Sequence, residues 1–174
     1  KRLSYLINDF LTVSRLKSGK FTVDLVECDI KKVIVDEVES LKEQFKSKDI
    51  RLKVNVDNHI GKMKIDEQKI RQVMMNLIDN ALHYTNAGGE VEATLKREGN
   101  SVVFEVKDSG IGVPKEDQAH LFSKMFRSGN ARDLRPDGTG LGLYLAKKVV
   151  LGHHGHIVFK SEVGKGSTFG FKIP

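Results

Sequence analysis

A run of glycines just before a predicted helix is the first feature of this sequence that could do chemistry. It reads DGTGLGLYLAKK at residues 137–148 and contains Gly138, Gly140 and Gly142. Glycines let backbone N–H groups approach an anion closely, and the N-terminus of a helix adds positive potential there. That potential contributes only about 0.3–1 kcal/mol per charge, so a polyphosphate would also need a metal ion and fixed donors. For the glycines alone, a flexible turn before an ordinary helix is an equally good interpretation.

The spacing of these glycines excludes the two commonest phosphate-binding loops. It does not fit the dinucleotide fingerprint G-x-G-x-x-G, and the chain contains no G-x-x-x-x-G-K-[ST]. An anion bound at this stretch would therefore be held by another kind of loop.

The stretch DSGIG, Asp108 to Gly112, ends a predicted strand. A buried aspartate there could accept a hydrogen bond from the exocyclic amine of adenine, while Gly110 and Gly112 leave room for the ring. Guanine would place a carbonyl oxygen against the same carboxylate, and mismatches of this kind can cost about 10⁴-fold in selectivity. The alternative for Asp108 is a turn former at the end of a strand, which its residue type alone favours.

A predicted helix that starts at Asp66 supplies candidate metal ligands. Asn76 and Asn80 are one helical turn apart on a polar face, and the apolar residues of the helix face the other way. Amide oxygens are reasonable ligands for Mg²⁺ that keeps most of its shell as water and phosphate. Asparagines on the surface of a helix are common, so a purely solvated face remains the alternative.

Hydrophobic periodicity predicts the elements that must position these residues. They are a helix at 1–17, a strand at 21–27, a helix at 30–48 capped by Asp29, a strand at 50–56, the helix from Asp66, a hairpin at 88–110, a helix from about Leu141 and a hairpin at 156–173. Helices interspersed with antiparallel hairpins predict an α+β two-layer sandwich rather than a parallel doubly wound sheet.

A long segment between the two hairpins, about residues 109–139, is polar and glycine-rich, with a short helical pattern around residues 115–126. Irregular segments of this length inside a compact domain are usually functional. We therefore expect a lid over a binding site.

Composition limits the class of protein. The 174 residues are enough for one sizeable core, and the single cysteine, Cys28, rules out an internal disulfide. The net charge of +6 comes from lysines and arginines interleaved with acids, which favours a solvated surface over a nucleic-acid patch.

The chain has no signal peptide and no apolar run near the roughly 18 residues that cross a bilayer, so we expect a soluble, cytoplasmic fragment without membrane contact. The N-terminal helix begins without a start signal and has a broad apolar stripe at Leu3, Leu6, Phe10 and Val13. Such a helix needs partner helices, and we expect the chain to be a piece of a larger protein.

Five motifs occur in an order that resembles a known family. They are NLIDNALHYT (76–85), DSGIG (108–112), LFSKMFR (121–127), GTGLGL (138–143) and GKGST (164–168). They resemble the N, G1, F, G2 and G3 boxes in the ATP-binding domain of sensor histidine kinases, which are Bergerat-fold ATPases. The resemblance implies a mixed, mostly antiparallel sheet packed on one side by three helices. Residues 1–20 would be the end of the second dimerisation and phosphoacceptor helix with its linker, and residues 21–174 the catalytic domain, with a flexible ATP lid at about 113–137.

The same resemblance implies cofactors and site residues. The cofactors would be ATP and Mg²⁺, with the metal held by Asn80 and Asn76. Catalytic roles would fall on Asn76, Lys124 and Arg127, and Phe122 would help to anchor the lid. Contacts to ATP would come from both asparagines and Arg127, and from His83, Tyr84, Asp108, Gly110, Ile111, Gly112, Phe126, Gly138, Thr139, Gly140, Leu141, Gly142, Leu143 and Thr168.

This chain departs from the family pattern at three points. His83 stands where the family usually has lysine or arginine, which weakens a phosphate contact at neutral pH unless the imidazole is protonated. His154-Gly155 replaces a usual Gly-Gly. None of the six histidines lies in an acceptor motif like H-E-x-x-T/N, so the acceptor helix is expected to lie outside this chain.

The implied function is that of the ATP-binding catalytic domain of a two-component sensor histidine kinase. It would donate the γ-phosphate of ATP to a histidine on a separate helical domain, for relay to the receiver domain of a response regulator. The parent protein would be a homodimer through its phosphoacceptor helices, anchored in the cell membrane. Two alternatives are a nucleotide-binding module without kinase activity and an ATP-hydrolysing relative. The second is disfavoured because Asn76 stands at the position of its general base and cannot take a proton from water.

Overall fold

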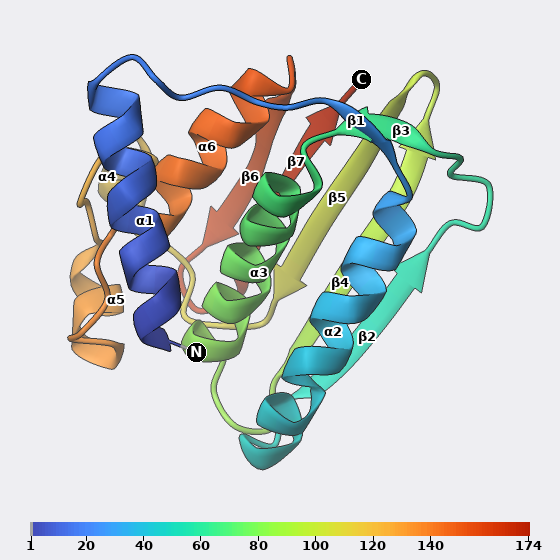
Figure 1. Ribbon diagram of the computed structural model, residues 1–174. Coiled ribbons are helices and arrows are strands. Elements are labelled where there is room, and N and C mark those ends of the chain that lie inside the picture. Colours follow the sequence, from blue (N-terminus) through green and yellow to red (C-terminus); the bar gives the residue numbers. More distant parts are fainter. Residues whose placement is uncertain (1) are drawn as a thin grey trace.

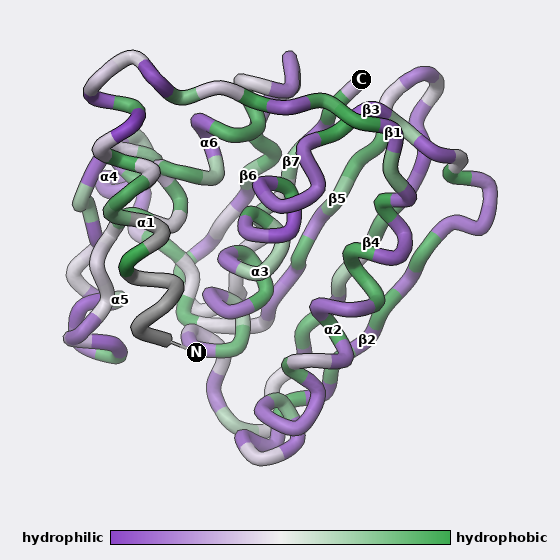
Figure 2. The backbone as a smooth tube through the Cα atoms, viewed as in Figure 1, coloured by the Kyte–Doolittle hydropathy of each residue, from purple (hydrophilic) through white to green (hydrophobic). Residues whose placement is uncertain are grey.

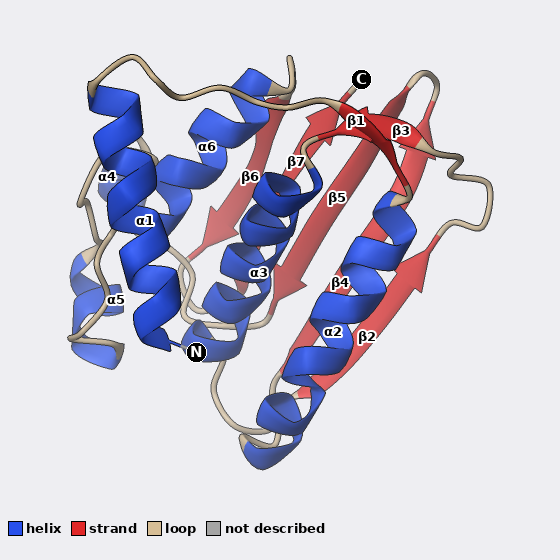
Figure 3. Cartoon of the chain, viewed as in Figure 1, coloured by secondary structure: helices blue, strands red, loops and turns tan. Residues whose placement is uncertain are grey.

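The computed structural model describes residues 2–174, except for the side chains of residues 2–6, 8 and 9. Its elements form two layers, a sheet and a set of helices (Figures 1 and 3). In chain order they are α1 (Arg2–Lys17), β1 (Val26–Cys28), α2 (Ile30–Ser47), β2 (Arg51–Val56), β3 (Met63–Ile65), α3 (Glu67–Tyr84), β4 (Glu90–Glu98), β5 (Ser101–Asp108), α4 (Lys115–Gln118), α5 (Gly129–Leu134), α6 (Gly142–Gly152), β6 (His156–Glu162) and β7 (Gly166–Ile173). The two predicted hairpins are confirmed as β4–β5 and β6–β7.

The main sheet has five strands in the order β2-β4-β5-β7-β6. β2 runs parallel to β4, and the other neighbouring pairs are antiparallel. This is the mixed, mostly antiparallel sheet that the sequence predicts, and the α+β class is confirmed. In the register of β5 and β7, Asp108 lies opposite Ser167. This register places the two residues next to each other at the end of both strands.

One face of the main sheet is covered by α2, α3 and α6 (Figure 3). The helices are amphipathic, as the change between hydrophobic and hydrophilic residues along α2 shows (Figure 2). Their apolar sides and alternate strand residues form one core, which includes Ile34, Leu41, Ile70, Leu77, Val150, Phe104 and Phe171, each at most 2% exposed. The predicted three-helix layer is therefore confirmed.

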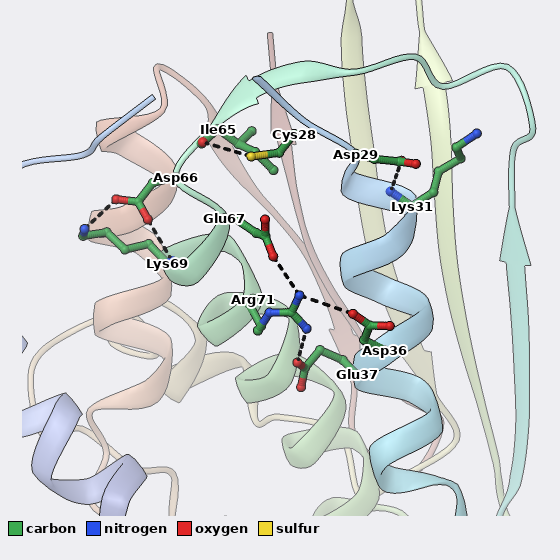
Figure 4. A network of polar contacts seen from close by, with 10 residues as sticks. All are labelled: Cys28, Asp29, Lys31, Asp36, Glu37, Ile65, Asp66, Glu67, Lys69 and Arg71. Carbon is green, nitrogen blue, oxygen red and sulfur yellow. Dashed lines mark hydrogen bonds and ion pairs between the residues drawn. The ribbon is translucent and has the colours of Figure 1, made fainter. Parts of the chain in front are cut away.

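An ion-pair network fixes the distance between α2 and α3 (Figure 4). Arg71 on α3 places Nη1 2.9 Å from Glu37 Oε1 and Nη2 2.9 Å from Glu67 Oε1. Asp36 Oδ2 lies 3.5 Å from the same Nη2. The hydrogen bond that Arg71 donates to Glu67, joined by its hydrogen bond to Glu37 and the charge of Glu37, raises the pKa of Arg71. The network holds the helix that carries the candidate metal ligands against its neighbour.

Asp66 is the N-cap of α3, as predicted, and it also joins two other segments. Its Oδ1 accepts from the backbone N–H of Lys69 at 3.1 Å, and Lys69 Nζ lies 2.6 Å from Oδ2. Oδ2 also accepts from the backbone N–H of Asp24 at 3.1 Å. At the C-terminal end of α6, His153 Nε2 accepts from the backbone N–H of Asp66 at 3.0 Å. The start of α3 is thus fixed to the linker after α1 and to α6.

The strand predicted at 21–27 is wrong for most of its length. Only Val26–Cys28 is extended, and it pairs with Met63–Ile65, a strand that the sequence did not predict. The preceding residues pack as an irregular linker: Lys69 Nζ lies 5.8 Å from the ring centroid of Phe21, and Val23 lies against Gly152. Tertiary contacts outweigh the local alternation here.

α1 lies beside α6 (Figure 1). Val13 is buried in a small cluster with Leu141 and Leu145. Ile7, Phe10 and Leu11 are at least half exposed, while Leu3 and Leu6 of the predicted stripe lie outside the described side chains. No helix in the described residues is long and apolar enough to cross a membrane.

Residues 113–137, called the lid segment below, connect β5 to α6. The helical pattern at 115–126 forms a helix only at Lys115–Gln118, and turns follow it. A second helix, Gly129–Leu134, was not predicted. Phe122 packs against Phe159 and Phe169, with ring centroids 5.9 and 6.4 Å apart, which anchors the middle of the segment on β6 and β7.

Candidate functional site

A cavity of about 560 Å³ lies between α3, the lid segment, the start of α6 and the ends of β5 and β7, and it reaches α2. The sequence-predicted residues that line it are Asn76, Asn80, His83, Tyr84, Asp108, Ile111, Gly112, Phe126, Arg127, Gly138, Thr139, Gly140, Gly142 and Leu143. The fold thus brings together residues more than 60 positions apart in the chain. Their contacts to ATP stay predictions.

Asp108 marks one end of the cavity. It is 7% exposed, and its Oδ1 accepts from the backbone N–H groups of Gly110 at 2.9 Å and Ser167 at 3.2 Å. No hydrogen bond within the described residues reaches its Oδ2. Burial raises the pKa of this carboxyl, and the two backbone N–H groups oppose that shift. One oxygen is therefore fixed by the fold, and the other is free to accept from a ligand.

The glycines after Asp108 lie in close contact with neighbouring backbone. A Cβ at Gly110 would lie 2.2 Å from the backbone oxygen of Tyr84, and one at Gly112 would lie 2.1 Å from that of Glu162. Gly112 also has a φ of +67°, which side chains rarely adopt. Close backbone packing thus requires glycine at both positions, and the expectation that both glycines make room for a base stays a prediction. Gly110 does not line the cavity.

Asn76 and Gly142 meet at the other end of the cavity. An ideal Cβ at Gly142 would lie 3.5 Å from Asn76 Cγ, so the asparagine amide lies against the first residue of α6. Asn76 Nδ2 is buried and has no hydrogen-bond partner in the described part of the chain. The residue before α6, Leu141, makes no side-chain capping bond, so the first N–H groups of the helix are not capped by it. This end therefore offers unused polar groups and the positive end of a helix.

Asp79 and Arg135 form an ion pair that crosses the cavity. Arg135 Nη1 from the lid segment lies 3.0 Å from Asp79 Oδ2 on α3. On the same helix, His83 Nδ1 lies 3.2 Å from Asp79 Oδ1 and 2.8 Å from the Asp79 backbone oxygen. Burial alone would raise the pKa of the Asp79 carboxyl, but the hydrogen bonds and charges of His83 and Arg135 hold it below its usual value. His83 is thereby held to its own helix.

Arg127 lines the cavity, but its guanidinium binds the lid segment. Nη1 donates to the backbone oxygens of Pro136 and Gly138, each at 3.2 Å. Nη2 donates to those of Ala131, at 3.0 Å, and Arg135. The arginine that was predicted to serve a polyphosphate therefore fastens the turn between α5 and the glycine run.

Besides Gly110, three predicted site residues do not line the cavity. Lys124 is exposed, and burial and the charge of Lys17 on α1 lower its pKa. Thr168 pairs with Lys107 on one side and with Lys160 on the other in the sheet. Successive residues of a strand point to opposite faces, so the preceding residue, Ser167, lines the cavity in place of Thr168. Leu141 is 5% exposed in the cluster under α1, and its N–H donates to Thr139 Oγ1 at 3.3 Å. The structure thus places these three residues outside the cavity lining, and their contacts to ATP stay predictions.

Sequence reasoning missed several residues of the cavity. Asp79 lies on the same face of α3 as Asn76 and Asn80, so the helical period was a signal for it. Ser167 follows from the alternation of β7. Arg135, and the α2 residues Glu37, Ser40, Leu41 and Gln44, reach the cavity only through tertiary packing, and no local pattern identifies them.

Comparison with known proteins places this site in a family. The model of the histidine kinase-, DNA gyrase B-, and HSP90-like ATPases matches residues 65–174, from the start of α3 to the end of β7. The chain belongs to this family. The matched segment holds all of the cavity except its α2 side, so this ATPase domain is the part of the chain that carries the site.

Individual relatives agree with this assignment. The chain is 35% identical over 176 residues to the circadian input-output histidine kinase CikA of Synechococcus elongatus, covering 100% of this chain and 23% of CikA. It is 35% identical to the sensor histidine kinase WalK of Bacillus subtilis, covering 100% of this chain and 29% of WalK. The chain therefore spans less than a third of the length of these two kinases.

A solved histidine kinase has the same fold. Full-length ShkA in complex with AMPPNP matches with a TM-score of 0.83 and 28% identity, covering 99% of this chain and 36% of ShkA. The predicted fold of the family's ATPase domain is thereby confirmed.

Proposed function

We propose that this chain is the ATP-binding catalytic part of a two-component sensor histidine kinase. It binds ATP with Mg²⁺ and donates the γ-phosphate to a histidine on a separate helical domain, from which a response-regulator receiver domain takes the phosphate. Residues 1–20 are the end of the phosphoacceptor helix and its linker, and residues 21–174 are the catalytic domain. In the parent protein, two copies associate through the phosphoacceptor helices, and a membrane anchor holds this domain on the cytoplasmic side.

The half-satisfied carboxylate of Asp108 is the observation that carries the proposal. Two backbone N–H groups hold its Oδ1, and Oδ2 keeps its acceptor capacity inside a largely buried pocket. Such a group suits the exocyclic amine of adenine and opposes the carbonyl oxygen of guanine. Ser167, on the neighbouring strand, supplies one of the two N–H groups and thereby sets the direction of the carboxylate.

The other end of the cavity suits a polyphosphate with its metal. The residues that would hold Mg²⁺ are Asn80 and Asn76, through their amide oxygens, while the amide nitrogen of Asn76 has no hydrogen-bond partner among the described residues. Two neutral amide oxygens match a Mg²⁺ that takes its remaining ligands from water and phosphate. When bound, Mg²⁺ would neutralise charge on the transferred phosphoryl group.

Phosphoryl transfer depends largely on positioning and electrostatics. In this chain, Asp108 fixes the base and the N-terminal N–H groups of α6 receive the phosphates. The lid segment, fastened by Arg127, covers the nucleotide and limits access of water. The bound AMPPNP of ShkA, a relative with the same fold, supports a nucleotide as the ligand.

A nucleotide-binding module without kinase activity is the second candidate. It is favoured by one observation: His83, at a position where the family usually has a cation, is bonded to Asp79 of its own helix. Steady hydrolysis of ATP is disfavoured, because Asn76 cannot serve as a general base and the nearby Asp79 is engaged with Arg135.

Calorimetric titration with ATP tests the nucleotide site. The wild-type chain should bind ATP in the presence of Mg²⁺ and more weakly when a chelator removes the metal. Asn80→Ala should weaken Mg-ATP binding at least about tenfold, since even the loss of an outer-shell partner of a metal ligand has that effect. Asn58→Ala, at an exposed turn outside the cavity, is the matched control and should bind like the wild type. Equal affinity for Asn80→Ala and the wild type would refute the metal assignment.

A further inference from the structure

Arg135 is the side chain of the lid segment that pairs with α3 across the cavity. Besides its ion pair with Asp79, its Nε lies 4.0 Å from Asp137 Oδ1. That Nε is buried and has no hydrogen-bond partner among residues that the structure describes. The Arg135 side chain is only 19% exposed. A mostly buried guanidinium thus holds one carboxylate and keeps a donor unused.

The ion pair of Asp79 and Arg135 lies beside the two asparagines proposed to hold the metal. Asp79 directly precedes Asn80 and follows Asn76 by three residues on the same helix, and all three line the cavity. The guanidinium therefore lies at the end of the cavity where the metal and the phosphates are proposed to bind. Any polyphosphate that enters this end meets the Asp79 carboxylate, which would repel it, and the Arg135 guanidinium, which would attract it.

Arg127 cannot take the role of a movable lid cation without loss of lid structure, because its guanidinium donates to four backbone oxygens. Arg135 has one strong partner, and that partner is a side chain. Moving the Arg135 side chain would break its ion pair with Asp79 and its longer contact with Asp137, and leave the turn fastened by Arg127 in place.

We propose that Arg135 exchanges its partner when nucleotide binds, from Asp79 in the free domain to the terminal phosphate of ATP. This inference rests on the proposed function, since it requires that Mg-ATP occupies the cavity. A guanidinium binds phosphate oxygens with paired, charge-assisted hydrogen bonds, and it does so at least as well as it binds a carboxylate. Asp79 keeps His83 as its partner after the exchange. The pair is thus a latch that the terminal phosphate opens.

A double-mutant cycle measures the exchange. Affinities for Mg-ATP and Mg-ADP are determined by calorimetry for the wild type, Asp79→Asn, Arg135→Gln and the double variant. Arg135→Gln should weaken Mg-ATP about tenfold, the scale of one hydrogen bond to a charged group, and weaken Mg-ADP by less than about twofold. Asp79→Asn should tighten Mg-ATP about five-fold, the scale of a partly exposed ion pair, and only while Arg135 is present.

The control is Arg132→Gln, an exposed arginine of α5, which should bind both nucleotides like the wild type. The inference is overturned if Arg135→Gln weakens ATP and ADP equally, or if Asp79→Asn tightens ATP as much in the Arg135→Gln background, since Asp79 would then repel phosphate without any latch. The comparison of ATP with ADP on Arg135→Gln alone decides the question should an Asp79 variant fail to fold. Failure of the wild type to bind Mg-ATP would instead overturn the proposed function.

Discussion

Replacing Asp108 with asparagine should change which base the cavity accepts. The two backbone N–H groups that bind Oδ1 require an acceptor, so the oxygen of the new amide must take that place. The amide nitrogen then occupies the position of Oδ2 and points a donor at the amine of adenine. The loss of a hydrogen bond to a charged group, about 1.5–3 kcal/mol, adds to the cost of an unpaired buried donor. We expect ATP binding to weaken by about 3 kcal/mol, which is about 150-fold.

The same variant should gain affinity for inosine triphosphate, whose base presents a carbonyl oxygen where adenine has its amine. Calorimetry with both nucleotides measures the two changes in one protein. Ser167→Ala is the matched control, because it keeps the backbone N–H that binds Asp108 and removes only the hydroxyl. Unchanged ATP affinity in Asp108→Asn, or equal losses for both nucleotides in a variant that unfolds at the wild-type temperature, would show that Asp108 does not bind the base.

Three further variants test how the fold holds the site. Burial lowers the pKa of His153 below 6.5, so the unfolded chain binds a proton that the native chain does not, and stability present above pH 6.5 is lost as pH falls. The wild type should lose up to about 1.4 kcal/mol of unfolding free energy per pH unit below about pH 6.5, and the His153→Gln variant should lose less per pH unit. Urea unfolding at several pH values measures this, and an equal dependence of unfolding free energy on pH in the two proteins would contradict it. Arg71→Met leaves Glu37, 8% exposed, without its partner. Arg71→Met should lower the unfolding free energy measured in urea by about 2 kcal/mol, which is less than the loss expected for a fully buried ion pair. An unchanged unfolding free energy would contradict a stabilising role of the network. Gly110→Ala brings a Cβ to 2.2 Å from a backbone oxygen and should lower the melting temperature by about 5 °C, while Gly61→Ala, with nothing within 4 Å, should not; equal melting temperatures would be the opposing result.

The residues at the two ends of the cavity could be predicted because local patterns fix them. A spacing of four residues, about one helical turn, aligns Asn76 with Asn80, and the end of a strand places Asp108 at the rim of the sheet. The hairpins could be predicted for the same reason, since Gly99 and Gly164 have positive φ at their turns. These features depend on contacts between residues close in sequence.

The remaining features depend on contacts between distant residues. The choice of Ser167 over Thr168 follows from the pairing of β7 with β5, in which a shift of one residue turns each side chain to the other face. The short pair of Val26–Cys28 with Met63–Ile65 joins segments far apart in the chain. Arg135 reaches Asp79 only because Arg127 folds the lid segment back on itself. No pattern within the lid segment contains that information.

Transfer of phosphate to a histidine separates a kinase domain from a nucleotide-binding module. The wild-type chain would be incubated with Mg²⁺ and ATP labelled at the γ-phosphate, together with the isolated dimerisation and phosphoacceptor domain of its parent kinase. Label is expected on the histidine of that domain, and far less of it when Asp108→Asn replaces the wild-type chain at an ATP concentration that is limiting for this variant. An unlabelled acceptor domain, with wild-type chain that still binds Mg-ATP, would contradict the kinase function and leave a nucleotide-binding module.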